Sequence, residues 1–323
     1  MLRVLGEYPE AAGERDAWIT AQRGQRNGVD PLRPYGFFVE DEPTAAGKIA
    51  PTATVFLTNR ECPWRCLMCD LWRNTLAESV PAGAIPRQID YALQRLPPAS
   101  QIKLYNSGSF FDPQAIPRGD YAAIAQRVSR FDRVIVECHP ALVGDDCAGF
   151  SDLLYGELEV AMGLETAHPE ILPRLNKRMT LELFRSAARF LEDREIGLRV
   201  FILIKPPFMR EEDAVEWAVR SLELAFDCGA TAATLIATRG GNGAMEALAA
   251  RGDFAPPGLR MLERAVEQGI AKNRGRVFAD LWDTASSPGC PECRTERIAR
   301  LLRMNLEQRI PAAIDCAACG GME

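Results

Sequence analysis

Residues 62–69 read Cys-Pro-Trp-Arg-Cys-Leu-Met-Cys and closely follow the apolar, β-branched stretch Ala-Thr-Val-Phe-Leu-Thr at 53–58. The stretch predicts a strand that enters a loop. Because iron–sulfur clusters normally take four thiolates, the three thiolates of Cys62, Cys66 and Cys69 predict a [4Fe-4S] cluster with one iron open to a ligand. A zinc site is the alternative. Zinc usually takes four ligands in pairs, however, and no fourth Cys or His lies nearby.

Length and composition indicate a compact enzyme without a membrane span. The chain has 323 residues, a net charge of −6 and ten cysteines. Seven of the cysteines stand in C-x3-C or C-x2-C pairs, which favours metal binding in a reducing cytosol over disulfides. The N-terminus turns polar soon after Leu2-Arg3-Val4, unlike a signal peptide, so we expect a cytoplasmic protein. The acidic charge argues against strong unaided binding of nucleic acid but leaves room for a local basic patch.

Strand and helix patterns alternate after residue 52, which predicts parallel strands joined by right-handed crossovers. Strands are predicted at 53–59, 101–106, 133–138, 157–163, 198–204 and 231–237, with a further one at 276–282. Helices are predicted at 86–96, 120–131, 181–194, 211–227 and 257–272, and a shorter one at 145–155. We predict an α/β fold with an irregular lead-in (1–51, with one helix near 10–26 and three prolines as breakers), a barrel (52–285) and a C-terminal extension (286–323).

The extension contains Cys290-Pro-Glu-Cys293 and Cys316-Ala-Ala-Cys319, separated by a segment with a predicted helix at 294–307. Two C-x2-C pairs at this spacing are a strong signal for a metal site, because each pair closes a tight turn and four thiolates complete a tetrahedron. A structural zinc ion is the first interpretation. A second four-cysteine iron–sulfur cluster is the alternative that the sequence leaves open.

Several polar groups follow the predicted strands, where the site of a parallel barrel lies. The small residues Asn106-Ser107-Gly108-Ser109 allow a ligand to approach the backbone closely. Glu137 stands at the next strand end, suited to ribose hydroxyls or a cationic substrate, and Lys205 at a later one. We therefore interpret Glu137 and Lys205 as candidate catalytic groups. His139 is interpreted as a neutral histidine bonded to a loop carbonyl, and 239–243 as a flexible loop that covers substrate.

The cysteine loop, with Met68 before its last cysteine, resembles the signature of the radical S-adenosylmethionine (SAM) enzymes. The resemblance implies an open (β/α)6 TIM-like barrel and SAM chelated to the open iron through its amino and carboxylate groups. One electron then breaks the sulfur–C5′ bond, and the 5′-deoxyadenosyl radical abstracts hydrogen from the substrate. The resemblance also places residues 106–109 at the amino group of SAM.

Residues 163–166 (Gly-Leu-Glu-Thr) and 172–178 (Leu-Pro-Arg-Leu-Asn-Lys-Arg) resemble the branch that includes coproporphyrinogen dehydrogenase, the methylthiotransferases and the Elongator catalytic subunit. In that branch the acidic or amide residue, here Glu165, reaches SAM. The basic cluster of Arg174, Lys177 and Arg178 is interpreted as a clamp for the SAM carboxylate or a substrate phosphate, and Arg178 is our candidate cofactor contact.

Over about residues 50–320 the chain is similar to the radical-SAM subunits of archaeosine synthase and their bacterial relatives. The similarity implies a 7-deazaguanine nucleoside in tRNA as one candidate substrate, a separate tRNA-binding partner, and an electron donor of the flavodoxin or ferredoxin type. Three alternatives stay open: a radical SAM enzyme for a small molecule, a fold that uses SAM only as ligand or methyl donor, and a non-catalytic metal ribbon that binds RNA or protein.

Overall fold

The computed structural model describes residues 6–282, 284 and 287–320, in which eight strands form one curled, half-barrel sheet in chain order. The strands are β1 (Gly36–Pro43), β2 (Ile49–Phe56), β3 (Gln101–Tyr105), β4 (Arg133–Glu137), β5 (Glu157–Glu165), β6 (Gly197–Ile204), β7 (Ala232–Ala237) and β8 (Arg276–Ala279). All neighbouring strands from β2 to β8 are parallel, whereas β1 pairs antiparallel with β2. The predicted fold class, an open barrel of parallel strands with a four-cysteine group near the C-terminus, is confirmed.

Among the described residues, eight helices occupy the predicted segments with small shifts at their ends, and two short ones, at Ile171–Arg174 and Ala244–Ala249, were not predicted. The helices are α1 (Ala12–Gln22), α2 (Ala84–Leu93), α3 (Tyr121–Val128), α4 (Asp145–Asp152), α5 (Ile171–Arg174), α6 (Leu181–Glu192), α7 (Ala214–Asp227), α8 (Ala244–Ala249), α9 (Leu259–Ala271) and α10 (Arg294–Glu307). Short 3-10 turns include η1 (Leu71–Asn74) and η3 (Pro140–Leu142). No helix in the described part of the chain combines the length and apolar character that crossing a membrane requires.

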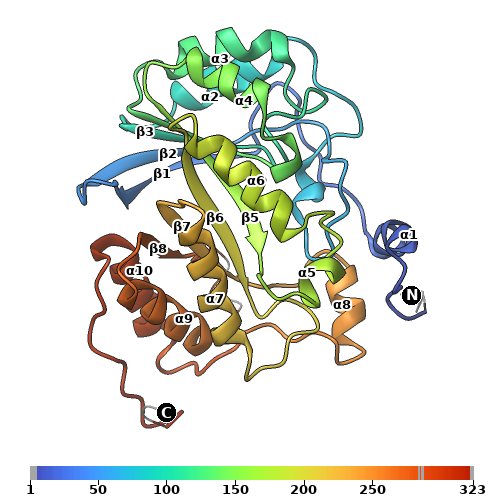
Figure 1. Cartoon of the computed structure of the whole chain (residues 1–323), viewed down its shortest axis with the longest axis vertical. Coiled ribbons are helices and arrows are strands. Elements are labelled where there is room, and N and C mark those ends of the chain that lie inside the picture. Colours follow the sequence, from blue (N-terminus) through green and yellow to red (C-terminus); the bar gives the residue numbers. More distant parts are fainter. Residues whose placement is uncertain (1–5, 283, 285–286, 321–323) are drawn as a thin grey trace.

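One face of the sheet packs against the helices and holds the main core. Alternate residues of the strands, such as Ile102, Leu104, Val134 and Val200, are fully buried there. Figure 1 shows α2, α3 and α4 grouped over one end of the sheet and α7, α9 and α10 over the other. Because side chains alternate along a strand, the intervening residues face the concave side of the half-barrel.

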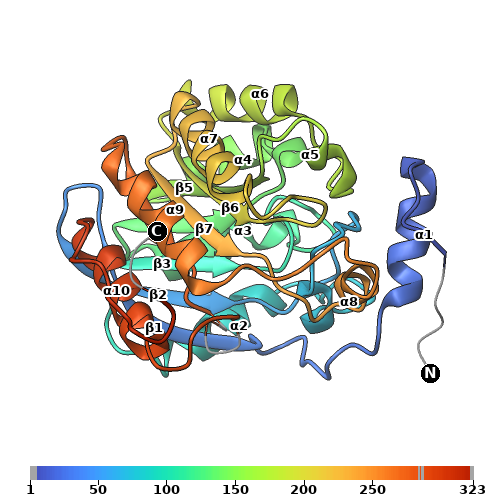
Figure 2. The same ribbon diagram turned by 90° about the horizontal axis from the view of Figure 1, so that it is seen from below.

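The N-terminal helix packs on the far side of the molecule from α10. In both Figure 1 and Figure 2, α1 lies beside α8, which agrees with the contacts between these two helices. Trp18 and Ile19 of α1 form a second buried cluster with Leu67 of the cysteine loop and Met245 of α8. A helix of the N-terminal lead-in and a helix after β7 therefore pack against the cysteine loop.

Two segments differ from the predicted secondary structure. Residues 36–43 are a strand rather than an irregular lead-in, with Gly36 opposite Phe56 and Pro43 opposite Ile49. A proline is tolerated there because it stands at the end of an edge strand. The segment after β7 is not a flexible cover, since Asn242 is buried and α8 begins directly after it. Residues 2–4, cited above against a signal peptide, and the outermost parts of the predicted lead-in and extension lie outside the described residues.

Candidate active site and metal centres

The three cysteines of the first motif lie on one loop just beyond the carboxyl end of β2. Cys62, Cys66 and Cys69 are each partly buried, and Leu67 between them is fully buried. Burial raises the pKa of each of the three thiols to about 12. Thiols in such surroundings stay protonated until a metal deprotonates them on binding.

Two asparagines from distant parts of the chain hold the backbone of this loop. Asn176 donates its side-chain amide to the carbonyl of Arg65 over 2.7 Å. Asn242 donates to the carbonyls of Leu67 over 2.7 Å and Cys69 over 3.1 Å. The loop shape is thus fixed by groups after β5 and after β7, so it does not depend on a bound cluster alone.

The small-residue turn after β3 lies directly against the first cysteine. A side chain at Gly108 would bring its Cβ within 3.2 Å of the Cys62 Cβ, so only glycine allows this approach without displacement. The side-chain amide of Asn106 is buried and has no hydrogen-bond partner among the described residues. A turn that touches a metal-loop cysteine and contains an unpartnered amide suits the binding of a polar ligand.

Glu137 supports this turn from the neighbouring strand end. Its Oε2 accepts a hydrogen bond from the backbone N–H of Asn106 over 2.9 Å. Burial raises the pKa of Glu137 to about 7, although hydrogen bonds from the turn at 106–108 act in the opposite direction. The carboxyl group predicted as catalytic is therefore engaged in orienting the turn.

An ion pair lies beside the cysteine loop at the end of β5. The Lys177 ammonium is 2.5 Å from Oε1 of Glu165; Glu165 is buried and Lys177 is largely buried. Burial by itself would lower the pKa of Lys177, but the Glu165 carboxylate outweighs it, so the pKa is raised and the amine stays charged. A side chain at Gly163 would overlap both groups, with its Cβ 2.2 Å from Glu165 Oε1 and 2.4 Å from Lys177 Nζ. The glycine of the Gly-Leu-Glu motif thus makes room for the pair.

Three strand ends place a non-glycine residue in the left-handed region. Ser107, Glu165 and Lys205 have φ values of 54°, 64° and 52°. Such conformations are uncommon outside glycine and often accompany functional sites. They concentrate here at the edge of the sheet where the cysteine loop lies.

Other predicted residues have different neighbours. The Arg178 guanidinium donates to the carbonyl of Ala12 over 2.7 Å and lies 3.3 Å from Asp16. It therefore contacts α1, while the adjacent Lys177 points to Glu165. Lys205 is buried and forms an ion pair with Glu211 in the loop before α7.

His139 connects three segments around the cysteine loop. Its ring stacks on Trp64 with centroids 3.8 Å apart. Its Nδ1 accepts from the N–H of Ala141 over 3.1 Å, so Nε2 carries the proton that is donated to the carbonyl of Lys177 over 2.9 Å. Burial lowers the pKa of His139 to about 4, which agrees with a neutral histidine bonded to a loop carbonyl. Ser109 also accepts, through Oγ, from the N–H of His139 over 2.8 Å.

Sequence reasoning missed the two asparagines that hold the loop. Asn176 stands in the Leu-x-x-x-Asn-Lys motif, in which the basic residues give the stronger signal. Asn242 follows two glycines, which indicate a flexible loop. A buried asparagine next to glycines is a signal for backbone hydrogen bonding, but its partner 173 residues away cannot be read from the chain.

The donor set around the loop fits the proposed cofactors. Three thiols leave one cluster iron without a protein ligand. Glu165 and Lys177 supply a carboxylate and a cation beside them, which matches the amino and carboxylate groups of SAM in charge.

The C-terminal cysteines form a separate, tighter group. The thiols of Cys290, Cys293, Cys316 and Cys319 all lie within 4.8 Å of one another. The thiols of Cys62, Cys66 and Cys69, also in the described part of the chain, do not come this close together. The two cysteine sets therefore offer different geometries to a metal.

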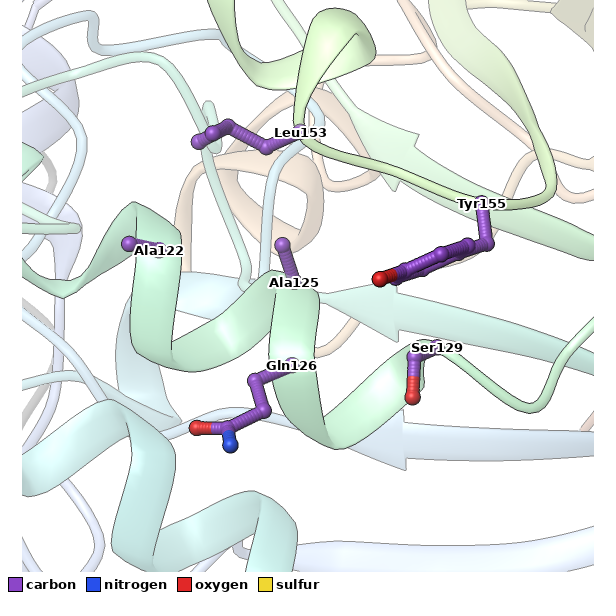
Figure 3. A pocket seen from close by; sticks show the side chains of 6 residues that line it. All are labelled: Ala122, Ala125, Gln126, Ser129, Leu153 and Tyr155. Atoms are coloured by element: carbon purple, nitrogen blue, oxygen red, sulfur yellow. The ribbon is translucent and has the colours of Figure 1, made fainter.

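One pocket lies on the outer layer, away from these groups. It has a volume of about 430 Å³ and lies between α3 and the segment that joins α4 to β5 (Figure 3). Its lining is Ala122, Ala125, Gln126, Ser129, Leu153 and Tyr155. None of these residues belongs to the strand-end set, and the lining lacks a metal ligand or an acid–base pair.

Comparisons with known proteins agree with the fold. No protein-family model matches the chain. An uncharacterised protein of Methanocaldococcus jannaschii is 23% identical over 301 residues, which cover 88% of this chain and 82% of that protein. The archaeosine synthase subunit beta of Methanosarcina acetivorans is 27% identical over 284 residues, 83% of this chain and 82% of that one. The crystal structure of methylornithine synthase superposes with a TM-score of 0.51 at 14% identity, over 79% of this chain and 70% of that chain, which shows a shared fold.

Proposed function

We propose that the chain is a radical SAM enzyme with a [4Fe-4S] cluster on Cys62, Cys66 and Cys69. Its fold, its cysteine motif and its sequence similarity together support membership of the radical SAM superfamily. When bound and reduced, the cluster supplies the electron that splits SAM into methionine and the 5′-deoxyadenosyl radical, which takes a hydrogen atom from the substrate. The single observation that carries this proposal is the contact of the three-cysteine loop with the turn at Gly108 and the neighbouring Glu165–Lys177 pair.

In this proposal the chain binds and orients SAM through groups at four strand ends. Lys177 attracts the carboxylate of SAM, and Glu165 accepts from its amino group. Glu137 holds the turn at 106–108 through its backbone N–H groups, so that the turn meets SAM in one conformation. Asn176 and Asn242 fix the cysteine loop. An external donor of the flavodoxin or ferredoxin type supplies the electron.

The test compares SAM cleavage and SAM binding in four proteins purified and reconstituted without oxygen. With dithionite as reductant, the wild type should form 5′-deoxyadenosine, and the variant with Cys62→Ala, Cys66→Ala and Cys69→Ala should form none. Lys177→Met should weaken SAM binding about tenfold or more, because it removes the buried cation and leaves Glu165 unpaired. The matched control is Arg178→Met, one residue further and paired with Asp16 at the surface, which should bind SAM within about twofold of the wild type.

Either of two results would refute the proposal. One is a reconstituted wild-type protein without iron. The other is formation of 5′-deoxyadenosine at an equal rate in the triple cysteine variant. Equal losses of SAM binding in Lys177→Met and Arg178→Met would leave the cluster assignment intact but contradict the assignment of Lys177 to SAM.

For the substrate, we propose a planar base, with a 7-deazaguanine nucleoside in tRNA as the first candidate. Partly exposed aromatic rings line the concave face in pairs. The ring centroids of Tyr105 and Phe201 are 6.0 Å apart, and those of Phe56 and Trp282 are 5.9 Å apart. Aromatic side chains stack on bases with about 1–3 kcal/mol for each base. Trp282 is 56% exposed and also lines a cavity of about 120 Å³ with Arg239. The similarity to archaeosine synthase subunits supports the same class.

The net charge of −6 supports two additions to this proposal: a separate protein that delivers the tRNA, and a small molecule as the alternative substrate. Turnover should therefore be assayed on modified tRNA with and without candidate tRNA-binding proteins and on the free nucleoside. Hydrogen transfer from the nucleoside into 5′-deoxyadenosine would support the nucleoside class. Transfer from neither substrate, in a protein that cleaves SAM, would favour another small molecule.

The cysteine usage supports a cytoplasmic location.

A further inference from the structure

The geometry points to a single tetrahedral metal ion, of the zinc class, held by Cys290, Cys293, Cys316 and Cys319. The Sγ atoms of Cys290 and Cys316 are 3.9 Å apart, and those of Cys293 and Cys319 are 3.8 Å apart. Four sulfur atoms bound to zinc at about 2.3 Å stand about 3.8 Å apart at the corners of a tetrahedron. These two distances match those around one ion with four thiolates.

The same spacing argues against a second iron–sulfur cluster. In a four-iron cluster each thiolate binds a different iron, so the four cysteine sulfurs stand much farther apart than around one ion. All four thiols here lie within 4.8 Å of one another. A cluster would require both cysteine turns to move apart, whereas a single ion requires no such movement.

An arginine network balances the charge of the site. A divalent ion with four thiolates has a net charge of −2. The buried Arg297 donates from Nε to the Cys293 sulfur over 3.1 Å, and Arg260 donates to the carbonyl of Cys319 over 3.2 Å. Arg297 also pairs with the buried Glu263 of α9. This second set of contacts orients the thiolates and ties the site to α9, as is common around metal ligands.

The ion would secure a helix that covers the open edge of the half-barrel. Cys293 directly precedes the first residue of α10. Near the other end of α10, Asn305 accepts from the N–H of Ala279 over 2.7 Å and donates to its carbonyl over 2.9 Å. Gln308 does the same at Val277, over 2.7 Å and 3.1 Å. Two side-chain amides therefore occupy the backbone groups that the last strand would otherwise present as an unpaired edge.

The assignment predicts two measurements that do not depend on the proposed reaction. X-ray absorption at the zinc edge of the wild-type protein should show four sulfur neighbours at about 2.3 Å. Metal analysis of the variant with Cys62→Ala, Cys66→Ala and Cys69→Ala should still give about one zinc per chain and no iron. If that variant does not fold, the wild-type absorption spectrum alone decides. A mononuclear iron, an iron–iron distance from a cluster tied to these cysteines, or no metal at all would overturn the assignment.

The structural role is tested by hydrogen exchange in the Cys319→Ser variant. Loss of one thiolate should loosen α10 and speed exchange of the Val277 and Ala279 amides about tenfold or more. The amide of Ile102 in β3 is the internal control and should change less than about twofold. Unchanged exchange at β8 in a variant that has lost its zinc would contradict the role of the ion at the edge. Because both variants are read out without SAM, failure here is distinct from failure of the proposed function.

Discussion

The environment of the Glu137 carboxyl group favours its protonated form. The group accepts from the N–H of Asn106, yet burial raises its pKa from the ordinary 4.5 to about 7. The folded protein therefore retains a proton that the unfolded chain releases at lower pH. Stability from this group is complete below about pH 4.5 and is lost as pH rises through about 7.

Glu137→Gln should remove this pH dependence, because glutamine keeps an acceptor oxygen but does not titrate. Between about pH 5 and about pH 8, the free energy of unfolding of the parent should fall by about 2–3 kcal/mol relative to the variant. Urea unfolding of the cluster-free triple cysteine protein measures it without interference from iron. The exposed Glu216→Gln serves as control and should follow the parent at every pH. Parallel profiles for the parent and Glu137→Gln would rule out the shifted pKa.

At the scale of residues, the sequence predicts which side chains stand at strand ends but not where each one points. The alternation of strands places Glu137 and Glu165 correctly at the ends of β4 and β5. It does not separate Lys177 from Arg178. Asn176 and Arg178 both adopt positive φ, at 55° and 59°, so the chain turns sharply there and sends the two basic side chains in different directions. Such a turn depends on tertiary contacts rather than on local preference.

At the scale of elements, the loop after β7 acts as a clamp on the cysteine loop. Asn242 bridges two carbonyls of the cysteine loop and accepts from the N–H of Met245 at the start of α8 over 2.9 Å. The sequence did not predict this role, because three glycines in 240–243 indicated mobility. Likewise the sequence does not predict β1, because the prolines at 31, 34 and 43 indicate irregular structure around it. Its pairing with β2 through a five-residue connection decides its structure.

Asn242→Ala should weaken the cysteine loop without removing any ligand. The change leaves two buried carbonyls without a donor, which costs about 2–3 kcal/mol. We expect iron loss to a chelator, after anaerobic reconstitution, to be about tenfold faster than in the wild type. Asn27→Ala removes an exposed asparagine that bonds Asn74 and should leave the rate within about twofold. Equal rates in Asn242→Ala and the wild type would show that the cluster ligands hold the loop without this clamp.

At the scale of the whole molecule, a network of buried charged side chains lies on the concave face of the sheet. Arg199 bonds Glu159 over 2.6 Å and also pairs with Glu42 on β1. Lys103 lies 2.5 Å from Glu42, and Arg276 lies 3.6 Å from Glu159. The network joins β1, β3, β5, β6 and β8, so it spans the half-barrel from one edge to the other. Hydrophobic patterning predicts the buried helix-facing side of each strand, but not partners 157 residues apart.

Arg199→Met tests whether this network holds the half-barrel together. Methionine retains an unbranched side chain but lacks the guanidinium group, so Glu42 and Glu159 stay buried with fewer partners. Removing one member of a buried ion pair costs about 3–5 kcal/mol. Urea unfolding followed by circular dichroism should therefore show a large drop in the midpoint. Arg220→Met is the matched control, since Arg220 forms an exposed pair with Glu216 at 2.6 Å that contributes at most about 0.5 kcal/mol. Because Arg199 bonds across β5 and β1, amides of β1 should also exchange faster in Arg199→Met than in the control. If both variants unfold at the same urea concentration, the buried charged network contributes no net stability to the half-barrel.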